Sequence, residues 1–440
     1  MLRVALIYVG EPESPSHPVM SPPVGVQLLG SVLRQAGYES DVFDTRLQSD
    51  DELHTAVDAF APDVVGLSFL SPNAARATEL GRAMRKRQRY VVAGGVHASV
   101  HADDLITTGA FDTVVRKDGE NAILEICEAV TAGRSPNPIV AGTPVANLDD
   151  LPVYDRFACY DAVYAGLRND SFIPAYLQLG RGCPMKCTFC ELPNREVFNP
   201  PRKNSFKSID RAMAEAHTYV DRWGVNFITL VDSIATLQLP LITEFVRRMA
   251  VELPHVGFML NSQVNRFNLE LAEAIGEAQR GRPAESRITV WFGFESGSQR
   301  LLNFMNKRTT VARGIEVAGW CRDHDVQVGA NILLGVPTET QEDYDGHDAF
   351  LAEITPTFPN PNILNPLPGT EMHRYCVDLD LLHDRTDLSI WSAEKIRELG
   401  RGPVRGVDYD RVLAAYHRYR NLDAASGPRY ESWAGDEALP

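Results

Sequence analysis

The stretch GRGCPMKCTFC, residues 180–190, holds three of the seven cysteines of this 440-residue chain, at Cys183, Cys187 and Cys190. Thiolates at this density hold a metal, usually an iron–sulfur cluster or zinc. A structural zinc site needs four closed ligands, and no fourth cysteine lies nearby in the sequence. A cubane cluster has four irons, so three cysteines leave one iron open to a small molecule. The spacing C-x3-C-x2-C therefore favours a cluster over a zinc site or three scattered core thiols.

This cysteine motif resembles that of the radical SAM superfamily. The resemblance implies a [4Fe-4S] cluster held by Cys183, Cys187 and Cys190. S-adenosylmethionine (SAM) would then chelate the open iron through its amino and carboxylate groups. Phe189 fits the family pattern of an aromatic residue that lies beside the adenine of SAM. The motif also follows a predicted strand directly, which is where α/β barrels place their chemistry.

Length and composition indicate two domains of a globular protein, with 44% hydrophobic and 23% charged residues. The net charge of −15 argues against binding to nucleic acid or an anionic membrane, which needs a basic surface. No apolar run reaches the roughly 18 residues of a membrane span, and the first apolar stretch is too short for a signal peptide. A cytoplasmic location is therefore expected, with the other cysteines as reduced, buried thiols: Cys127, Cys159, Cys321 and Cys376.

The first 130 residues alternate short apolar runs with helical patterns, which is typical of a parallel, doubly wound sheet. Leu28, Leu29 and Val32, for example, recur at helical spacing. Ligands of such sheets bind beyond the carboxyl ends of the strands. The predicted strands are 3–9, 40–43, 63–67, 90–93 and 113–115, and the predicted helices are 25–36, 73–88 and 120–131.

From residue 174 onward the alternation resumes with about six further units, which predicts a partial, TIM-like (β/α)6 barrel. The predicted strands are 175–179, 226–231, 257–261, 289–294, 326–334 and 361–364. A proline-rich connector with few periodic apolar runs lies between the two halves. After the barrel we expect one helix near 411–419 and a disordered polar end. The expected domains are a Rossmann-like domain 1–131, a connector 132–172, a barrel 173–376 and a short carboxyl-terminal region 377–440.

The resemblance to the radical SAM family extends over the whole barrel and assigns SAM contacts to the ends of its strands. These candidates are Asp232 and Ser233 for the amino group of SAM, Glu295 and Ser296 for its methionine or ribose, and Asn331 and Gly335 for its adenine. Residue chemistry alone leaves alternatives open. Asp232 fits a helix N-cap equally well, and an internal Arg–Glu ion pair would satisfy Glu295.

Two further barrel segments match the family. Lys307 stands where the family has a lysine after a helix, although a solvent-facing lysine explains it equally. Residues 367–370 resemble the closing-strand motif that shapes the substrate mouth, although a simple Pro-Gly turn explains them as well. No residue stands out as the catalytic or substrate-binding group.

The amino-terminal domain carries two of the three sequence marks of flavodoxin-like cobalamin-binding domains. Ser68 and Leu70 form S-x-L at the end of the third predicted strand, and Gly94 and Gly95 form G-G at the end of the fourth. Small residues let a flat corrin and its nucleotide tail approach the backbone. The resemblance therefore implies that these four residues bind cobalamin. His97 follows the glycines and is either a further cofactor contact or an ordinary surface or core histidine.

The third mark, D-x-H-x-x-G, is absent. His17 is present in the loop after the first strand, but Pro15 and Met20 replace the aspartate and the glycine. A metal-ligating histidine normally has a carboxylate behind it, so we interpret His17 as an ordinary loop residue. Cobalamin would then bind without a protein histidine on cobalt. This resembles the cobalamin-dependent (class B) radical SAM enzymes, in which such a cobalt suits homolytic methyl transfer to a carbon radical.

The resemblance implies a radical methyltransferase with three cofactors, namely a [4Fe-4S] cluster, SAM and cobalamin. It would transfer the methyl group of methylcobalamin to an unactivated carbon of a small, natural-product-like substrate through a 5′-deoxyadenosyl radical. A flavodoxin- or ferredoxin-type protein would be the reductant. Three alternatives stay open: a rearrangement, cyclisation or ring contraction with the same cofactors, a non-catalytic cobalamin or iron–sulfur sensor, and an enzyme with a vestigial corrin domain.

Overall fold

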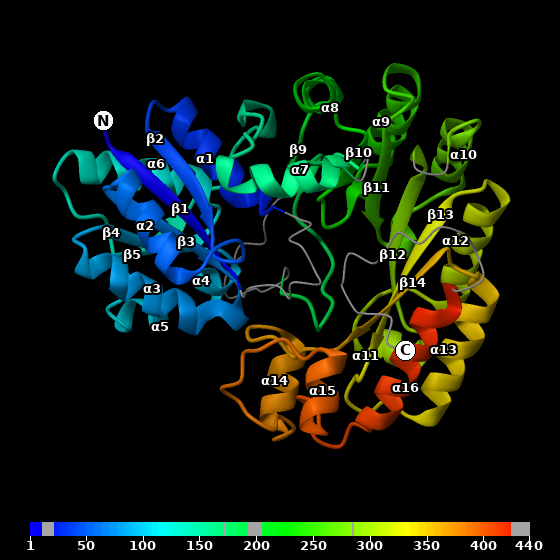
Figure 1. Ribbon diagram of the computed structural model, residues 1–440. Helices are drawn as coiled ribbons and strands as arrows, with labels where there is room; N and C mark the ends of the chain where they lie inside the picture. The colour runs from blue at the N-terminus through cyan, green and yellow to red at the C-terminus, as the bar shows by residue number, and fades with distance from the viewer. Residues whose placement is uncertain (11–21, 170–171, 192–204, 284–285, 424–440) are drawn as a thin grey trace. The chain divides into compact units, whose positions relative to one another are not determined.

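The chain folds into two compact units, one formed by the described residues up to 169 and the other by those from 172 onward (Figure 1). Each unit is built around its own six-stranded parallel sheet. His17 and the carboxyl-terminal end that is predicted to be disordered lie outside the described residues. In the computed structural model the described residues are 1–10, 22–169, 172–191, 205–283 and 286–423.

The first unit is the predicted doubly wound sheet, with the strand order β2-β1-β3-β4-β5-β6. The order changes direction between β1 and β3, which is the position where such sheets bind ligands. Val4, Ala5 and Ile7 of β1 are fully buried, because helices cover both faces of a parallel sheet. The strands are β1 (Arg3–Val9), β2 (Glu39–Asp44), β3 (Val64–Phe69), β4 (Tyr90–Gly94), β5 (Thr113–Lys117) and β6 (Ile139–Gly142).

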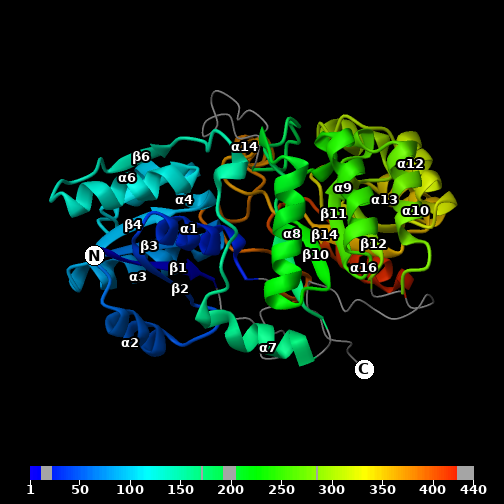
Figure 2. The same ribbon diagram turned by 90° about the horizontal axis from the view of Figure 1, so that it is seen from above.

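Helices connect these strands on both sides of the sheet. Helices α1 and α6 contact each other on one side, and α2 and α3 lie on the other (Figure 2). Ser49 begins α2 with a capping box, because its hydroxyl accepts from Glu52 N–H while the Glu52 carboxylate accepts from Ser49 N–H. The helices are α1 (Val24–Gln35), α2 (Asp50–Phe60), α3 (Ala74–Lys86), α4 (Val96–Val100), α5 (Ala102–Thr107) and α6 (Gly119–Thr131).

The segment predicted as a connector contributes β6, a strand that is not among those predicted from the sequence. It pairs in parallel with β5 at the edge of the first sheet. An edge strand needs only one partner, so four residues beside several prolines suffice and the apolar signal is weak. The connector also packs on this unit, since Tyr160 Oη donates to Asp44 Oδ2 at 2.9 Å. Helix α7 (Asp161–Asn169) then leads to the second unit.

The second unit is a six-stranded parallel sheet with the order β14-β13-β12-β11-β10-β7, as predicted for a partial barrel. A two-stranded antiparallel ladder of β8 (Gly180–Arg181) and β9 (Ser205–Phe206) stands apart from it. The main strands are β7 (Pro174–Leu177), β10 (Phe227–Leu230), β11 (Gly257–Ser262), β12 (Ile288–Glu295), β13 (Gln327–Leu334) and β14 (Phe358–Ile363). The helices that follow them are α8 (Ile209–Trp223), α9 (Leu239–Glu252), α10 (Leu269–Gln279), α11 (Gln299–Phe304), α12 (Val311–Asp323) and α13 (Gln341–Ile354).

In the described residues up to 423, three α-helices follow the barrel: α14 (Glu371–Asp378), α15 (Ala393–Leu399) and α16 (Tyr409–Arg420). The predicted helix near 411–419 corresponds to α16, which contacts β13 and β14. Helices α14 and α15 are short and were not predicted. In the part of the chain that the structure describes, no helix has the length and apolar character that a bilayer crossing demands.

Candidate cofactor sites

The cysteine loop, residues 183–190, is held by backbone contacts from segments that follow much later in the chain. Thr188 N–H donates to the Met305 carbonyl at 3.0 Å, and the Thr188 carbonyl accepts from Met372 N–H at 2.8 Å. Met305 ends α11, and Met372 lies in the first turn of α14. The tertiary structure of the barrel unit therefore sets the backbone path between the cysteines.

The three thiols are sulfur donors of the kind that hold an iron–sulfur cluster. Cys183 and Cys190 are half-buried and Cys187 is 9% exposed. Within the described ranges, no three His, Cys, Asp or Glu side chains form a group that could hold one metal ion. In a cubane each cysteine binds a different iron, so the sulfurs surround a volume and do not converge on one point. Burial raises the pKa of the Cys183 and Cys187 thiols, and the Lys307 ammonium opposes this shift.

A buried ion pair lies beside the cysteines. Lys307 Nζ is 2.8 Å from Glu295 Oε1, with side chains 8% and 13% exposed. Lys307 Nζ also lies 5.8 Å from the centre of the Phe189 ring. The solvent-facing interpretation of Lys307 is therefore wrong, because Glu295 neutralises its charge and permits burial. Burial alone lowers the pKa of Lys307, but Glu295 and the sulfurs of Cys187 and Cys190 outweigh that effect and raise it. A fixed positive charge here suits a cluster of thiolates.

The backbone around Glu295 is adapted to this pair. Glu295 has φ of 65°, a left-handed conformation that is rare for a non-glycine residue and is often found at functional sites. The pairing between β12 and β13 shifts register between Gly293 and Glu295. A Cβ on Gly293 would lie 2.6 Å from Glu295 Oε1 and 2.8 Å from Lys307 Nζ. Glycine at position 293 thus leaves room for the ion pair, while the contact of Glu295 with SAM stays a prediction.

Asp232, which lies just after β10, organises the chain that leads into the cysteine loop. Its Oδ2 accepts from Leu179 N–H at 2.9 Å, and its Oδ1 accepts from Gly180 N–H at 2.5 Å. The side chain is buried. Asp232 is not a helix N-cap, because the N-cap residue of the next α-helix, α9, is Gln238. Burial raises the pKa of Asp232 to about 7, against the opposing effect of the two amides and Lys207. Its contact with the amino group of SAM, like that of the exposed Ser233 beside it, stays a prediction.

We expect Asp232→Asn to change the pH dependence of stability. Because folding raises this pKa, the carboxyl contributes stability that is fully present below its unfolded pKa and is lost as pH rises through about 7. Between about pH 6 and about pH 8, the free energy of unfolding should fall by about 1 kcal/mol more in the wild type than in the variant. Denaturant unfolding at several pH values measures the difference. Asp323→Asn, at an exposed carboxyl in α12, is the control, and parallel curves for Asp232→Asn and wild type would contradict the expectation.

Of the remaining SAM candidates, Ser296 and Gly335 follow the ends of β12 and β13, whereas Asn331 lies within β13. Ser296 is 1% exposed, and its Oγ accepts from Ser298 N–H at 3.0 Å. Gly335 has φ of 76° and donates its N–H to Glu339 Oε2 at 2.8 Å. Asn331 is half-buried on β13. The structure thus brings Phe189 and Glu295 to the cysteines and joins Ser296 and Gly335 through a separate polar network. Phe189 packs on a core cluster of Leu301, Met305, Leu333, Val336, Leu364 and Met372.

In the first unit the predicted cobalamin residues gather at the carboxyl ends of β3 and β4. Ser68 and Gly94 are register partners on these two strands. A Cβ on Gly94 would meet no heavy atom within 4 Å, whereas one on Gly95, with φ of 97°, would lie 2.9 Å from a carbonyl of β3. Beside them Leu70 is 39% exposed and Val96 is 41% exposed. Open space next to exposed apolar side chains fits a large, flat ligand such as a corrin. We call these five residues the cobalamin edge.

His97 is a buried histidine and does not lie on the exposed part of this edge. It is 4% exposed, and its Nδ1 lies 3.0 Å from Ser71 Oγ. Its ring stacks on that of His101 with 4.5 Å between centroids. Burial, together with the neighbouring His101, lowers the pKa of His97 to about 4. The core-histidine alternative agrees with this burial, and a contact with cobalamin stays a prediction.

Val96 was not predicted as part of a site, and Lys307, although it matched the family pattern, was not predicted as the partner of Glu295. Sequence alone does not separate an exposed valine at a strand end from a buried one. For Glu295, the usable signal was a strand-tip carboxylate that needs a buried partner. The interpretation from residue chemistry named arginine, whereas the structure supplies Lys307 from the turn after α11.

Two family models match the chain, one in each unit. The B12 binding domain family matches residues 18–127, and the radical SAM superfamily matches residues 177–351. The first match includes the cobalamin edge. The second includes the cysteine loop and the ends of β10, β12 and β13.

The chain is 24% identical over 383 residues to an uncharacterised methyltransferase of Pyrococcus horikoshii, covering 82% of this chain and 80% of the relative. It is 22% identical over 427 residues to the anaerobic magnesium-protoporphyrin IX monomethyl ester cyclase of Rubrivivax gelatinosus, covering 90% and 73%. Among solved structures, the radical SAM methyltransferase TsrM from Kitasatospora setae, with cobalamin and a [4Fe-4S] cluster bound, superposes with a TM-score of 0.70 at 15% identity, covering 100% of this chain and 94% of TsrM.

The two matched domains and the two sheets confirm the predicted fold class, a Rossmann-like B12-binding domain followed by a partial radical SAM barrel. They also establish the cofactors as cobalamin, SAM and a [4Fe-4S] cluster. The thiols beside a buried lysine fit the cluster, and the open glycine at the cobalamin edge fits a corrin. On these grounds the chain belongs to the cobalamin-dependent radical SAM enzymes.

Proposed function

We propose that this enzyme transfers the methyl group of methylcobalamin to an unactivated carbon of a small, natural-product-like molecule. The observation that carries the proposal is the presence in one chain of the cysteine loop and of a cobalamin edge without the D-x-H-x-x-G motif. Similarity to methyltransferases over most of the chain supports it. TsrM is also known with a tryptophan substrate and a SAM analogue bound, which supports a small substrate here.

Each group of residues has a distinct part in this proposal. Cys183, Cys187 and Cys190 hold the cluster, and Lys307 fixes a positive charge beside them. Phe189 lies against the adenine of SAM. When bound, the cofactors supply a 5′-deoxyadenosyl radical and a transferable methyl group. A flavodoxin- or ferredoxin-type protein would supply the electrons that these cofactors need. The cytoplasmic location remains a prediction.

A reaction without methyl transfer is the second candidate. The cyclase relative, which covers 90% of this chain, favours a cyclisation or rearrangement with the same cofactors. Both candidates need reductive cleavage of SAM, whereas a sensor does not. The reaction product therefore separates all three possibilities.

Anaerobic preparation with iron, sulfide and hydroxocobalamin, followed by turnover with methyl-labelled SAM and a panel of small molecules, tests the proposal. We expect 5′-deoxyadenosine and a product heavier than its substrate by one CH2 unit that carries the label. A product of altered connectivity without the label would support the second candidate. Absence of 5′-deoxyadenosine from a preparation with full iron content would exclude both and favour a sensor.

The open space at the cobalamin edge gives a prediction of its own. Gly94→Leu should leave the fold intact, because a Cβ at this position would meet no heavy atom within 4 Å. The leucine side chain would occupy the space proposed for the corrin, so cobalamin affinity should fall by at least about tenfold. Absorption spectra during titration with hydroxocobalamin measure the affinity. Gly166→Leu, at an exposed position of α7, is the control, and unchanged affinity in Gly94→Leu would remove cobalamin from this edge.

A further inference from the structure

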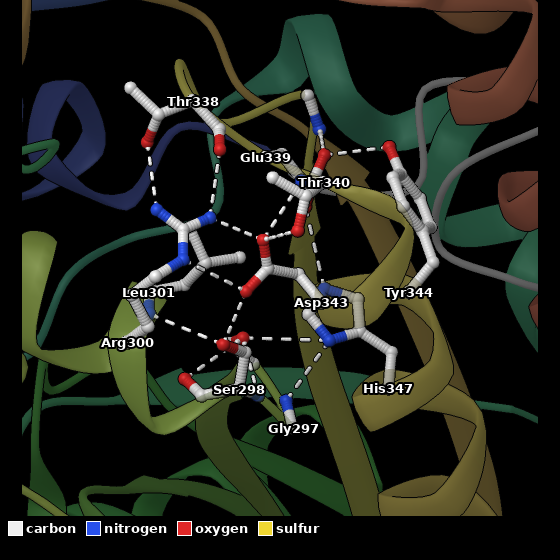
Figure 3. Close-up of polar contacts among 12 residues, drawn as sticks. Gly297, Ser298, Arg300, Leu301, Thr338, Glu339, Thr340, Asp343, Tyr344 and His347 are labelled. Carbon is white, nitrogen blue, oxygen red and sulfur yellow. Dashed lines mark hydrogen bonds and ion pairs between the residues drawn. The ribbon is translucent and has the colours of Figure 1, made fainter.

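A buried polar network joins the ends of β12 and β13 through helix α13 (Figure 3). The side chain of His347, on α13, is fully buried, and that of Glu339, just before this helix, is 2% exposed. Gly297 N–H donates to His347 Nδ1 at 3.2 Å, and Gly335 N–H donates to Glu339 Oε2 at 2.8 Å. Each of the two side chains thus holds the turn that follows one strand.

The contact with Gly297 determines where His347 carries its proton. A backbone N–H only donates, so Nδ1 accepts and the ring proton lies on Nε2. Nε2 is 3.4 Å from Glu339 Oε1, and among the described residues neither atom forms a hydrogen bond, either with the other or with a third group. A buried donor therefore faces a buried acceptor, and leaving both unpaired is costly. Glu339 Oε2 is itself held, since it also accepts from Tyr344 Oη at 2.6 Å.

Close packing locks α13 to the turn after β12. A Cβ on Gly297 would lie 2.3 Å from the Gly346 carbonyl oxygen, so only glycine permits this approach. Ser298 Oγ donates to Asp343 Oδ1 at 2.5 Å, and Arg300 forms an ion pair with the same carboxylate. Figure 3 shows Asp343 between Ser298 and Arg300, with His347 one helical turn further on. These contacts therefore join the helix directly to the turn.

The two turns held by this network carry candidate SAM residues. Ser296 immediately precedes Gly297, and Gly335 is itself a candidate. The backbone is left-handed at Gly335 and also at Glu295, where the strand register shifts. Regular strand pairing does not fix such turns, so other contacts must hold them.

We infer that His347 is a positioning residue for SAM. Its Nδ1 fixes the turn after β12, its Nε2 faces the Glu339 carboxylate that fixes the turn after β13, and the pair sets the spacing between the two turns. The inference deepens the proposed function, because it rests on the proposed SAM contacts of Ser296 and Gly335. It assigns His347 no contact with SAM itself.

Two substitutions test the contacts of the two ring nitrogens of His347 separately. His347→Asn retains an acceptor near Nδ1 and removes the Nε2–H that faces Glu339, whereas His347→Gln retains a donor near Nε2 and removes the acceptor of Gly297. In the reconstituted holoenzyme we expect each to raise the KM for SAM by about tenfold, with kcat for 5′-deoxyadenosine formation within about twofold of wild type. Equilibrium dialysis should show the same loss of SAM affinity without turnover.

Leu351→Ala is the matched control, since Leu351 is buried on the same helix outside the network. It should lower the melting temperature and leave the KM for SAM unchanged. In the chain without cofactors, amide hydrogen exchange over residues 296–298 and 334–336 should accelerate in the His347 variants and not in Leu351→Ala. His347 variants that lose only melting temperature, as the control does, would overturn the inference.

If neither His347 variant folds, the same measurements are made on Glu339→Gln, which preserves the side-chain volume. A single amide oxygen at this position cannot accept from Gly335, Tyr344 and His347 together, so we expect the same rise in KM, and an unchanged KM would overturn the inference. The proposed function and the positioning role of His347 can be refuted separately. Wild-type protein that does not bind SAM contradicts the proposed function, whereas wild-type binding with unaffected variants contradicts only the positioning role.

Discussion

Replacing Cys187 by alanine should abolish reductive cleavage of SAM. With one of three thiolates removed, the remaining two cannot hold a cubane that presents a single open iron. After anaerobic reconstitution with iron and sulfide and reduction with dithionite, 5′-deoxyadenosine should fall to the level of protein without iron. Iron content and the visible absorbance of the cluster should fall in parallel.

Cys321→Ala is the matched control, because this buried thiol belongs to α12 of the same unit and lies outside the cysteine loop. This variant also loses one thiol, but it should retain both the cluster and SAM cleavage. Two results would refute the assignment of the loop: full 5′-deoxyadenosine formation by Cys187→Ala, or tetrahedral zinc in the anaerobically prepared wild type.

Replacing Lys307 by methionine should destabilise the barrel unit strongly, because Glu295 would stay buried without a counter-charge. Removing one partner of a buried ion pair costs about 3–5 kcal/mol. Denaturant unfolding of the chain without cofactors measures this loss directly. The double variant Lys307→Met with Glu295→Leu should recover most of the stability, since neither charge then remains to be buried.

An exposed ion pair provides the comparison for Lys307. Arg247 and Glu270 are 54% and 61% exposed, so Arg247→Met should cost about 0–1 kcal/mol. If Lys307→Met costs no more than Arg247→Met, the pair beside the cysteines is not a buried one. If the double variant is as unstable as Lys307→Met, the loss comes from packing and not from the uncompensated carboxylate.

The sequence was sufficient to predict both sheets because their strands are buried on two faces and form continuous apolar runs. The first predicted strand, 3–9, has the bounds of β1, and the other predicted strands lie within a few residues of the observed ones. Within the two six-stranded sheets the exception is β6, an edge strand of four residues beside prolines, and the short β8 and β9 outside these sheets were not predicted either. The assignment of β6 depends on pairing with β5, which the local sequence does not encode.

The candidate sites were predictable where chemistry follows from residue type and spacing, as for the three cysteines and the paired motifs that end β3 and β4. Contacts between segments that lie far apart in the sequence were not predictable. The partner of Glu295 comes from beyond α11, and the role of Asp232 is to accept from amides about fifty residues earlier. The pair of His347 and Glu339 links the ends of two strands through a third element. Sequence periodicity and motifs carry no information about such tertiary contacts.

The exposed Leu70 and Val96 bear on how this enzyme is produced. In a host that neither makes nor imports cobalamin, the protein would accumulate with two large hydrophobic side chains exposed to solvent. Exposed hydrophobic surface of this kind promotes self-association. If cobalamin binds at this edge, as we propose, supplying it during expression should cover them and, by mass action, draw the polypeptide toward its native state. Solubility yield with and without added cobalamin thus becomes a simple reporter of this surface.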